Sequence, residues 1–247
     1  MGQRLKGKVA IVTGASRGMG LEISRLFASE GAQVAMLARS PDELRSASAD
    51  IQGTHPFACD VADPAAVATT FATIDRRFGR IDILINNAGL ARPRLIEEAD
   101  DNELALQVGA NLLGPVHCMR AAIPAMRRNG IGDIVNISSE SVTTPYPFLL
   151  FYAATKAALE AITTGLRSEL KGSGIRASLY RSGRVISSFN EAWDPTMLDQ
   201  VKAMAASSGF NDQSGGRIEA TIPAQAMLDL VLLDRSAHIE MIQLRGA

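Results

Sequence analysis

The apolar run Val9-Ala10-Ile11-Val12-Thr13 and the turn Gly14-Ala15-Ser16-Arg17-Gly18-Met19-Gly20 that follows it decide the fold class of this chain. An uninterrupted apolar run of this length is typical of a parallel strand that is buried on both faces. The three glycines allow a tight turn with close backbone approach to a ligand. Apolar residues at helical spacing come next, at Met19, Ile23, Leu26 and Phe27. This order of strand, turn and helix predicts a βαβ unit with an anion site at the helix N-terminus.

The alternation of strand and helix patterns continues to the C-terminus. Further strands are expected at 33–38, around Phe57, and at 81–86, 133–138, 175–179 and 239–244. Further helices are expected from Asp63-Pro64 to Phe78, near 101–128 with bends at Pro115 and Pro124, from Tyr152 to about Lys171, and near 223–233. No linker or break in composition interrupts the pattern. We therefore predict one domain, 1–247, of the α/β class: a doubly wound, Rossmann-like parallel sheet of about seven strands with helices on both faces.

The composition narrows the kinds of partner. Twenty-five basic and 26 acidic residues give a net charge of -1, which favours a small-molecule partner over nucleic acid or an acidic membrane. Neither Cys59 and Cys118 nor the three histidines, His55, His117 and His238, have metal-ligand spacing, so no metal is expected. No run is apolar for long enough to be a signal peptide or a membrane span, and a cytoplasmic protein is expected.

One long segment, from Ser187 to about Arg217, shows no strong periodicity. It mixes Phe189, Trp193 and Met197 with serines and glycines, and it is too long for an ordinary connection. We interpret it as a substrate lid. A poorly ordered insertion is the alternative.

Tyr152 and Lys156 are four residues apart, which places a phenol and an ammonium on one face of a helix. A nearby cation favours the phenolate and lowers the phenol pKa from about 10, so the hydroxyl could exchange a proton near neutral pH. By itself such a pair is more often an ordinary surface contact.

The end of the second predicted strand indicates which nicotinamide cofactor, NADP or NAD, the chain would bind. Ala38-Arg39 offers no carboxylate for a ribose 2′-hydroxyl, whereas an arginine there can pair with a 2′-phosphate. Arg17, in the glycine-rich turn, could complete this cationic site, although either arginine could simply be solvated. The pattern favours NADP over NAD.

Several motifs occur together, at matching separations over nearly the whole chain. They are the turn from Thr13 to Gly20, Asn86-Asn87-Ala88-Gly89, Asn111, Ile137-Ser138-Ser139, and Tyr152 through Lys156. With these motifs the chain resembles the short-chain dehydrogenase/reductase family, which implies a nicotinamide-dependent oxidoreductase acting on an alcohol or a carbonyl.

The resemblance also implies roles for single residues. Those implied to contact the cofactor are Gly14, Ser16, Arg17, Gly18, Met19, Gly20, Arg39, Asp60, Val61, Asn87, Ala88, Gly89, Tyr152, Lys156, Gly183, Val185 and Ser187. Ser139 would bind the substrate oxygen; it is preferred to Ser138 because it stands thirteen positions before Tyr152 and strand alternation turns its neighbour away. Tyr152 would transfer the proton, while Lys156 would lower the tyrosine pKa and hold the nicotinamide ribose. Asn111 would support a proton relay, or else stabilise a bent helix beside Gly114-Pro115.

The chain departs from the family pattern after the sixth predicted strand. Ser178 stands where the family usually has asparagine, and Ser182-Gly183 stands where it has Pro-Gly. Losing the proline could loosen the loop that meets the nicotinamide. The ending 239–244 lacks the family's frequent Thr-Gly and Asp-Gly-Gly, so a homotetramer is less certain than a homodimer through the helices that contain Asn111 and Tyr152.

The residues before the tyrosine, 145–151, are apolar, and with the lid they suggest a lipophilic ketone or secondary alcohol, unless they pack in the core. Two other functions stay open. The altered Ser182-Gly183 loop could mark a nucleotide-binding sensor without turnover. A reductase of carrier-linked acyl chains would need a basic docking patch, for which Arg92, Arg94, Arg127 and Arg128 are the visible candidates.

Overall fold

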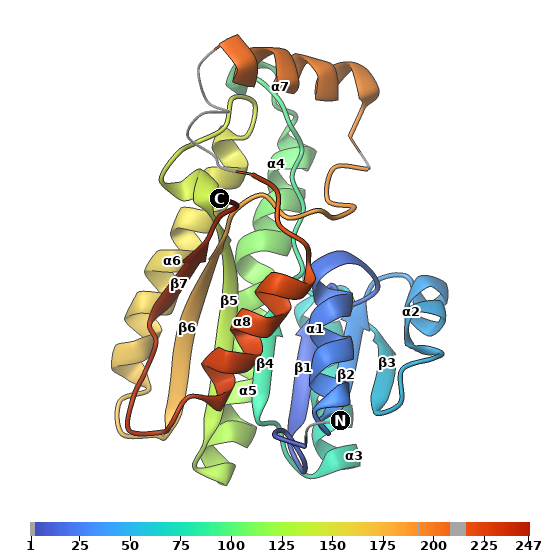
Figure 1. The fold of residues 1–247 in the computed structure, drawn as a ribbon, viewed down its shortest axis with the longest axis vertical. Helices are drawn as coiled ribbons and strands as arrows, with labels where there is room; N and C mark the ends of the chain where they lie inside the picture. Colours follow the sequence, from blue (N-terminus) through green and yellow to red (C-terminus); the bar gives the residue numbers. More distant parts are fainter. Residues whose placement is uncertain (1–2, 192, 208–215) are drawn as a thin grey trace.

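The computed structural model describes residues 3–191, 193–207 and 216–247. They contain a seven-stranded parallel sheet in the order β3-β2-β1-β4-β5-β6-β7 (Figure 1). The strands are β1 (Val9–Thr13), β2 (Gln33–Ala38), β3 (Thr54–Ala58), β4 (Ile83–Asn86), β5 (Gly132–Ser139), β6 (Ile175–Ser182) and β7 (Met241–Leu244). The strand order reverses its direction between β1 and β4, where doubly wound sheets bind their ligands. The predicted fold class is confirmed.

Helices cover both faces of this sheet. The helices of the described residues are α1 (Gly18–Ser29), α2 (Pro41–Ser48), α3 (Pro64–Phe78), α4 (Asp101–Val108), α5 (Gly114–Asn129), α6 (Leu150–Glu169), α7 (Pro195–Ser207) and α8 (Thr221–Leu232). Helix α7 lies beyond the end of the sheet rather than on one of its faces (Figure 1). Helices α1 and α8 pack together on one face, α3 and α5 pack together on the other, and α6 covers β5 and β6.

Side-chain alternation along the central strand builds a core on each face. In β1, Ala10 and Val12 belong to the cluster that includes Phe27 of α1, whereas Val9 and Ile11 belong to the cluster around α3 and α5. All four strand residues are buried, which explains why β1 reads as a continuous apolar run rather than an alternating one. Burial of each large side chain contributes about 1.5–3 kcal/mol.

The helical region predicted near 101–128 is interrupted earlier than its prolines suggest. A π-helical turn, Gly109–Leu113, separates α4 from α5. Pro115 lies directly after the π-helical turn, in the first turn of α5, and Pro124 lies inside α5 without ending it. The prediction of a break near Pro115 was therefore close, but the break lies on its N-terminal side.

Two helices were not predicted. Helix α2 begins after Ser40, whose side chain accepts a hydrogen bond from Glu43 N, with Pro41 in the first turn. Helix α7 lies within the segment interpreted as a lid, and Asp194 caps it by accepting from Thr196 N at 2.9 Å. Both starts carry a cap followed by a proline, a signal that was available in the sequence. Residues 208–215 of the lid segment lie outside the described residues.

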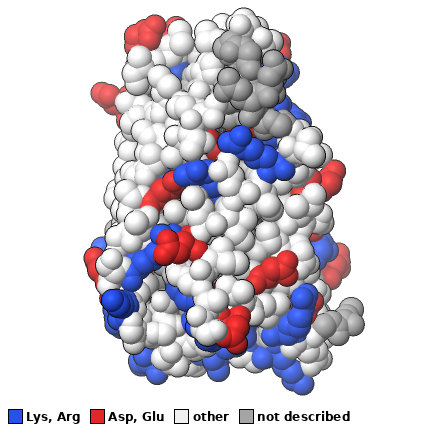
Figure 2. All heavy atoms as spheres, turned by 60° about the vertical axis from the view of Figure 1, so that its left-hand side comes forward, with Lys and Arg blue, Asp and Glu red and all other residues white. Residues whose placement is uncertain are grey.

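The surface carries mixed charge. Figure 2, which brings the α6 side of Figure 1 forward, shows acidic and basic side chains interspersed between broad areas without charge. Within the described ranges, no helix combines the length and the apolar character that crossing a bilayer requires.

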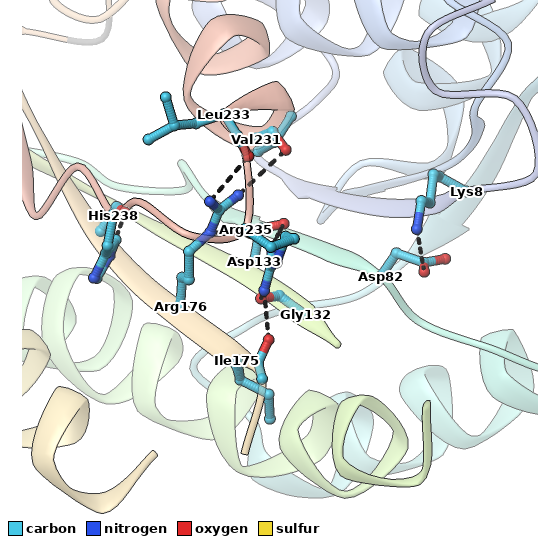
Figure 3. Close-up of polar contacts among 12 residues, drawn as sticks. Lys8, Asp82, Gly132, Asp133, Ile175, Arg176, Val231, Leu233, Arg235 and His238 are labelled. Atoms are coloured by element: carbon cyan, nitrogen blue, oxygen red, sulfur yellow. Dashed lines mark hydrogen bonds and ion pairs between the residues drawn. The ribbon is translucent and has the colours of Figure 1, made fainter. Parts of the chain in front are cut away.

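The end of the sheet where the strands begin is held by a network around Asp133 (Figure 3). The carboxylate pairs with Arg176 Nε at 2.7 Å and with Arg235 Nη1 at 2.8 Å. Arg176 also donates to the carbonyl oxygens of Leu233 and Ala237, at 3.1 and 3.0 Å. The network therefore fastens the connection between α8 and β7 to the start of β5 and β6.

Candidate active site

The glycine-rich turn between β1 and α1 is built by glycines that its own packing requires. Gly14 has a φ of +63°, and a Cβ there would lie 2.9 Å from the Cα of Ala88. A Cβ on Gly20 would lie 2.3 Å from the carbonyl oxygen of Gly14. Gly18 also has a positive φ, +55°. A larger residue at Gly14 would push the turn away from the loop after β4, and a larger residue at Gly20 would force the turn itself open.

The start of α1 fits the pyrophosphate of a dinucleotide. The helix begins at Gly18 after Arg17, with no side-chain cap and no acidic residue in its first turn. Its first N–H groups therefore face outward without a side-chain acceptor, and the helix dipole favours an anion there.

The loop after β4 is tied to this turn. Asn87 Nδ2 donates to the carbonyl oxygens of Thr13 and Gly14, at 2.9 and 3.1 Å. The hydroxyl of Thr13 accepts from the backbone N–H groups of Asn87 and Ala88. A Cβ on Gly89 would lie 3.4 Å from Lys156 Nζ, so this loop spans the distance between the glycine turn and the lysine.

The two arginines predicted to pair with a ribose phosphate, Arg39 and Arg17, lie on segments next to Ser16, another residue implied to contact the cofactor. Arg39 is exposed at the end of β2, while Ser16 Oγ donates to Glu43 Oε2 at 3.3 Å. Arg17 lies 3.8 Å from Glu191, in the lid segment. The structure thus places two residues implied to contact the cofactor beside carboxylates, a feature that the sequence analysis missed.

The other residues implied to contact the cofactor also lie at the carboxyl ends of the strands. Asp60 is exposed and Val61 is buried just after β3. Val185 forms an isolated parallel bridge with Ile218, and a Cβ on Gly18 would lie 3.5 Å from Ser187. The two ends of the lid segment are therefore joined beside the glycine turn.

Tyr152 and Lys156 project from α6 toward the end of β5, where Ser139 lies. The lysine Nζ is 5.9 Å from the centre of the tyrosine ring and donates to the carbonyl oxygen of Ile137 at 2.8 Å. Ser139 lies near enough to Tyr152 to oppose the rise of the phenol pKa, whereas the hydroxyl of Ser138 donates to Glu160 at 2.6 Å. The structure thus brings Ser139, Tyr152 and Lys156 together and turns Ser138 away from them.

The pKa values differ from the sequence-based expectation. Burial raises the pKa of Tyr152 to about 12, and Ser139 only partly opposes this rise. Burial also lowers the pKa of Lys156 to about 8. The expected lowering of the tyrosine pKa by the lysine is therefore not seen in this structure, because removal from water disfavours the charged phenolate and the only opposing cause is Ser139.

Asn111 lies in the π-helical turn and is completely buried. Its amide group exchanges hydrogen bonds with the backbone of Leu90, at 2.8 and 2.9 Å, and Nδ2 also donates to Thr155 Oγ1 at 3.2 Å. A Cβ on Gly89 would meet its Oδ1 at 3.1 Å. The side chain thus holds the bend between α4 and α5 and also lies beside Gly89 and Thr155. The proton-relay role of Asn111 stays a prediction.

The loop after β6 is better held than its missing proline suggests. Strand β6 continues to Ser182, which pairs in register with Ser139 of β5 and Leu244 of β7. Gly183 N then donates to the carbonyl oxygen of Leu244 at 2.9 Å, and a Cβ on Gly183 would lie 2.6 Å from that oxygen. Pairing with the C-terminal strand therefore replaces the constraint of a fixed proline φ.

Apolar side chains surround Tyr152. Tyr152 forms a buried cluster with Ala91 and Leu149, and Tyr146 and Trp193 pack against it. The ring of Phe189 lies 5.7 Å from that of Tyr152. Phe148 and Leu149 are themselves buried, so part of the apolar run 145–151 packs in the interior and part of it borders the tyrosine.

The four candidate docking arginines do not form one patch. Arg127 and Arg128 lie at the C-terminal end of α5, just before β5 begins, whereas Ser139 lies where β5 ends. Arg128 pairs with Asp75 at 2.7 Å. Of the four, Arg92 and Arg94 lie on the loop that contacts Phe148, just before the helix of Tyr152. Among the described residues, no three His, Cys, Asp or Glu side chains are grouped as metal ligands.

Known proteins resemble this chain in sequence over most of its length. The family model described as short chain dehydrogenase matches residues 8–197. D-threitol dehydrogenase of Mycolicibacterium smegmatis is 33% identical over 212 residues, which are 84% of this chain and 82% of that protein. A short-chain type dehydrogenase/reductase of Picea abies is 35% identical over 237 residues, covering 91% and 86% of the two chains.

Solved structures agree over almost the full length. A 3-ketoacyl-(acyl-carrier-protein) reductase from Brucella melitensis, complexed with NADH, is 26% identical with a TM-score of 0.85, and the match covers 98% of each chain. A metagenomic short-chain oxidoreductase in complex with NADP is 28% identical with a TM-score of 0.81, over 99% of each chain.

Proposed function

Because the chain belongs to the short-chain dehydrogenase/reductase family and is a NAD(P)-dependent oxidoreductase of CH–OH or C=O groups, we propose that it interconverts a lipophilic ketone and a secondary alcohol with NADP(H). The observation that carries the proposal is the group formed by Ser139, Tyr152 and Lys156 inside an apolar surround. Such a group can hold a carbonyl oxygen and supply its proton.

Proton transfer falls to Tyr152. Its raised pKa keeps the phenol protonated at neutral pH, which suits a donor to the oxygen of a ketone that is being reduced. Ser139 would hydrogen-bond the same oxygen and stabilise its developing charge. Lys156, held by Ile137 and protonated below pH about 8, would place a positive charge beside the phenol and hold the nicotinamide ribose. The nicotinamide cofactor supplies or accepts the hydride when bound.

Support for NADP rather than NAD comes from the residues at the adenosine end of the site. Arg39, Arg17 and Ser16 offer two cations and a hydroxyl on adjacent segments, and the end of β2 bears no carboxylate. A phosphate with two negative charges would draw these groups to itself, whereas a neutral 2′-hydroxyl would gain little from them.

The decisive experiment measures NADPH and NADH oxidation with a panel of lipophilic ketones, using Tyr152→Phe in parallel. Turnover that prefers NADPH and falls by about 10²–10⁴ in the variant is expected, because the variant keeps the ring and loses the proton. Turnover that is equal in the two proteins contradicts the mechanism. Binding of NADPH without turnover of any ketone would favour the nucleotide sensor instead.

The segment 187–217 is proposed as the substrate lid of a single domain. Phe189 contacts the ring of Tyr152, and Ser187 and Glu191 lie beside Gly18 and Arg17. The first five residues of the segment, 187–191, thus border both Tyr152 and the glycine-rich turn. Deletion of α7 is expected to raise the KM for ketones more than the Kd for NADPH.

A homodimer through α4, α5 and α6 is also proposed. Large apolar side chains are exposed on this side of the molecule, namely Leu106, Leu113, Leu150 and Ile162. Such side chains favour an interface with a second copy. Light scattering after gel filtration measures the mass, and Leu113→Glu with Ile162→Glu is expected to yield the monomer.

A carrier-linked acyl chain is the second candidate substrate. The presence of Arg92 and Arg94 on the loop beside the catalytic group favours it. However, Arg94 is already paired with Glu103 at 3.2 Å, which reduces the charge available to an acidic carrier. Competition by an acyl carrier protein against a free ketone distinguishes the two substrates.

A further inference from the structure

Trp193 lies one aromatic ring beyond the catalytic tyrosine. The ring of Phe189 is 5.7 Å from Tyr152 on one side and 6.2 Å from Trp193 on the other. The indole also packs against the cluster of Ala91, Leu149 and Tyr152. It therefore belongs to the apolar wall proposed for the substrate.

The indole nitrogen of Trp193 is buried, yet its N–H has no hydrogen-bond acceptor in the part of the chain that the structure describes. This group can only donate. Leaving a buried donor unpaired costs about 1–3 kcal/mol, and such groups are rare in folded proteins. An unpaired donor at the border of a substrate site is accounted for if a ligand supplies the acceptor.

Packing alone explains the ring but not its N–H. Trp193 stands immediately before Asp194, which caps α7. An apolar side chain at this position commonly packs against the first turns of its helix. Phenylalanine would serve that purpose as well and would bury no polar group.

We propose that Trp193 Nε1–H is a specificity determinant that donates a hydrogen bond to a second, neutral oxygen of the substrate. This inference rests on the proposed function, since it assigns a substrate class to the same site. The preferred substrate is a ketone, or the matching secondary alcohol, with an ether, carbonyl or hydroxyl oxygen about one ring away from the reacting carbon. The oxygen is neutral because the side chains that pack around Trp193 are apolar and aromatic, and burying a carboxylate among them would cost more than burying a neutral acceptor.

The single tryptophan of the chain makes the N–H directly observable. A protein labelled with ¹⁵N-tryptophan gives one indole N–H signal, and NADP⁺ keeps added ketones unreacted. The probes are phenylacetones with a methoxy group at the 2-, 3- or 4-position, each paired with the ethyl compound of the same size. At one ring position, the methoxy ketone is expected to move the indole proton signal downfield and its ethyl partner is not.

Kinetics with NADPH give a second, independent readout. In the wild-type protein, kcat/KM for that methoxy ketone is expected to exceed the value for its ethyl partner about tenfold, as one hydrogen bond allows. In Trp193→Phe the ratio is expected to fall to about one. Phe189→Leu is the matched control, because it alters the same wall without removing a donor and should keep the ratio.

Two results would overturn the inference. In one, no methoxy ketone moves the indole signal more than its ethyl partner does. In the other, Trp193→Phe keeps the wild-type ratio, which would reduce the residue to a packing role. Failure of the proposed function appears separately, as an absence of NADPH oxidation with every ketone, and the indole signal still reports whether the acceptor is bound.

Discussion

Glu160 of α6 and Arg181 of β6 form an ion pair of 2.6 Å next to the strand that ends at Ser139. Only 14% of the Glu160 side chain and 12% of the Arg181 side chain are exposed. Glu160 also accepts a hydrogen bond from the Ser138 hydroxyl, at 2.6 Å, and it lies four residues after Lys156 on α6. One carboxylate therefore fastens α6, β5 and β6 together at the point where Tyr152 and Ser139 must meet.

Glu160→Gln is expected to destabilise the protein by about 3 kcal/mol, because it leaves Arg181 nearly buried without a compensating charge. The double variant Glu160→Met/Arg181→Met should regain most of that loss, since it removes both charges. Urea unfolding at pH 7 measures both values. A single variant as stable as the wild type would show that the pair contributes nothing.

Lys156 is expected to be a site where function costs stability. Burial lowers its pKa from 10.5 to about 8. This shift lowers the free energy of unfolding by about 3 kcal/mol at pH 7. A variant without the ammonium also loses the hydrogen bond to Ile137, which lowers its free energy of unfolding by about 1 kcal/mol. Lys156→Met should therefore raise the free energy of unfolding by about 2 kcal/mol while abolishing turnover.

The same shift predicts how that difference depends on pH. Between pH 8 and 10.5 the unfolded chain binds more protons at Lys156 than the folded protein does, so wild-type stability gains with rising pH in this window. The amount by which the free energy of unfolding of Lys156→Met exceeds that of the wild type should be largest below pH 8 and should shrink above it. A difference that stays constant up to pH 10 would contradict the assignment.

Ketone reduction is expected to decline as the pH rises above about 8. Tyr152 stays protonated throughout this range, whereas Lys156 loses the charge that the proposed mechanism requires. The measurement is kcat/KM for a ketone at saturating NADPH from pH 6 to 10. In Lys156→Arg the charge persists, so any activity left should not show this decline; a flat wild-type profile would remove Lys156 from the mechanism.

Arg39→Ala is expected to lower kcat/KM for NADPH by about 10–100-fold and to leave the value for NADH nearly unchanged, because only the phosphate needs the cation. Comparison of the two cofactors in one preparation excludes a folding effect. Arg77→Ala is the matched control, since that arginine contacts His55 at 2.9 Å, away from the glycine turn. An equal loss with both cofactors would place Arg39 outside phosphate recognition.

The sequence predicted the sheet well because its strands are short apolar runs bounded by glycines and caps, as at Val9–Thr13. The sequence did not predict the contacts between segments that are far apart in the chain. Nothing in the spacing of Ser138, Glu160 and Arg181 indicates that three elements bring them together. The tyrosine pKa was mispredicted for a related reason: the effect of a neighbouring charge can be inferred from i and i+4 positions, whereas the degree of burial depends on the whole fold.

Asp133→Asn tests the network at the opposite end of the sheet. Asp133 faces Arg176 and Arg235, and only 9% of the Arg176 side chain is exposed (Figure 3). Loss of the charge leaves Arg176 buried among carbonyl oxygens alone, so a loss of about 3–5 kcal/mol is expected in urea unfolding.

The matched control for Asp133→Asn is Asp199→Asn, which removes a carboxylate from an exposed pair with Lys202 and should cause no measurable change. Asp133 lies at the start of β5, whereas Ser139 lies at its end, so kcat of the folded Asp133→Asn protein should match that of the wild type. If its kcat falls while its stability holds, the network acts on the active site through β5 rather than anchoring the connection between α8 and β7.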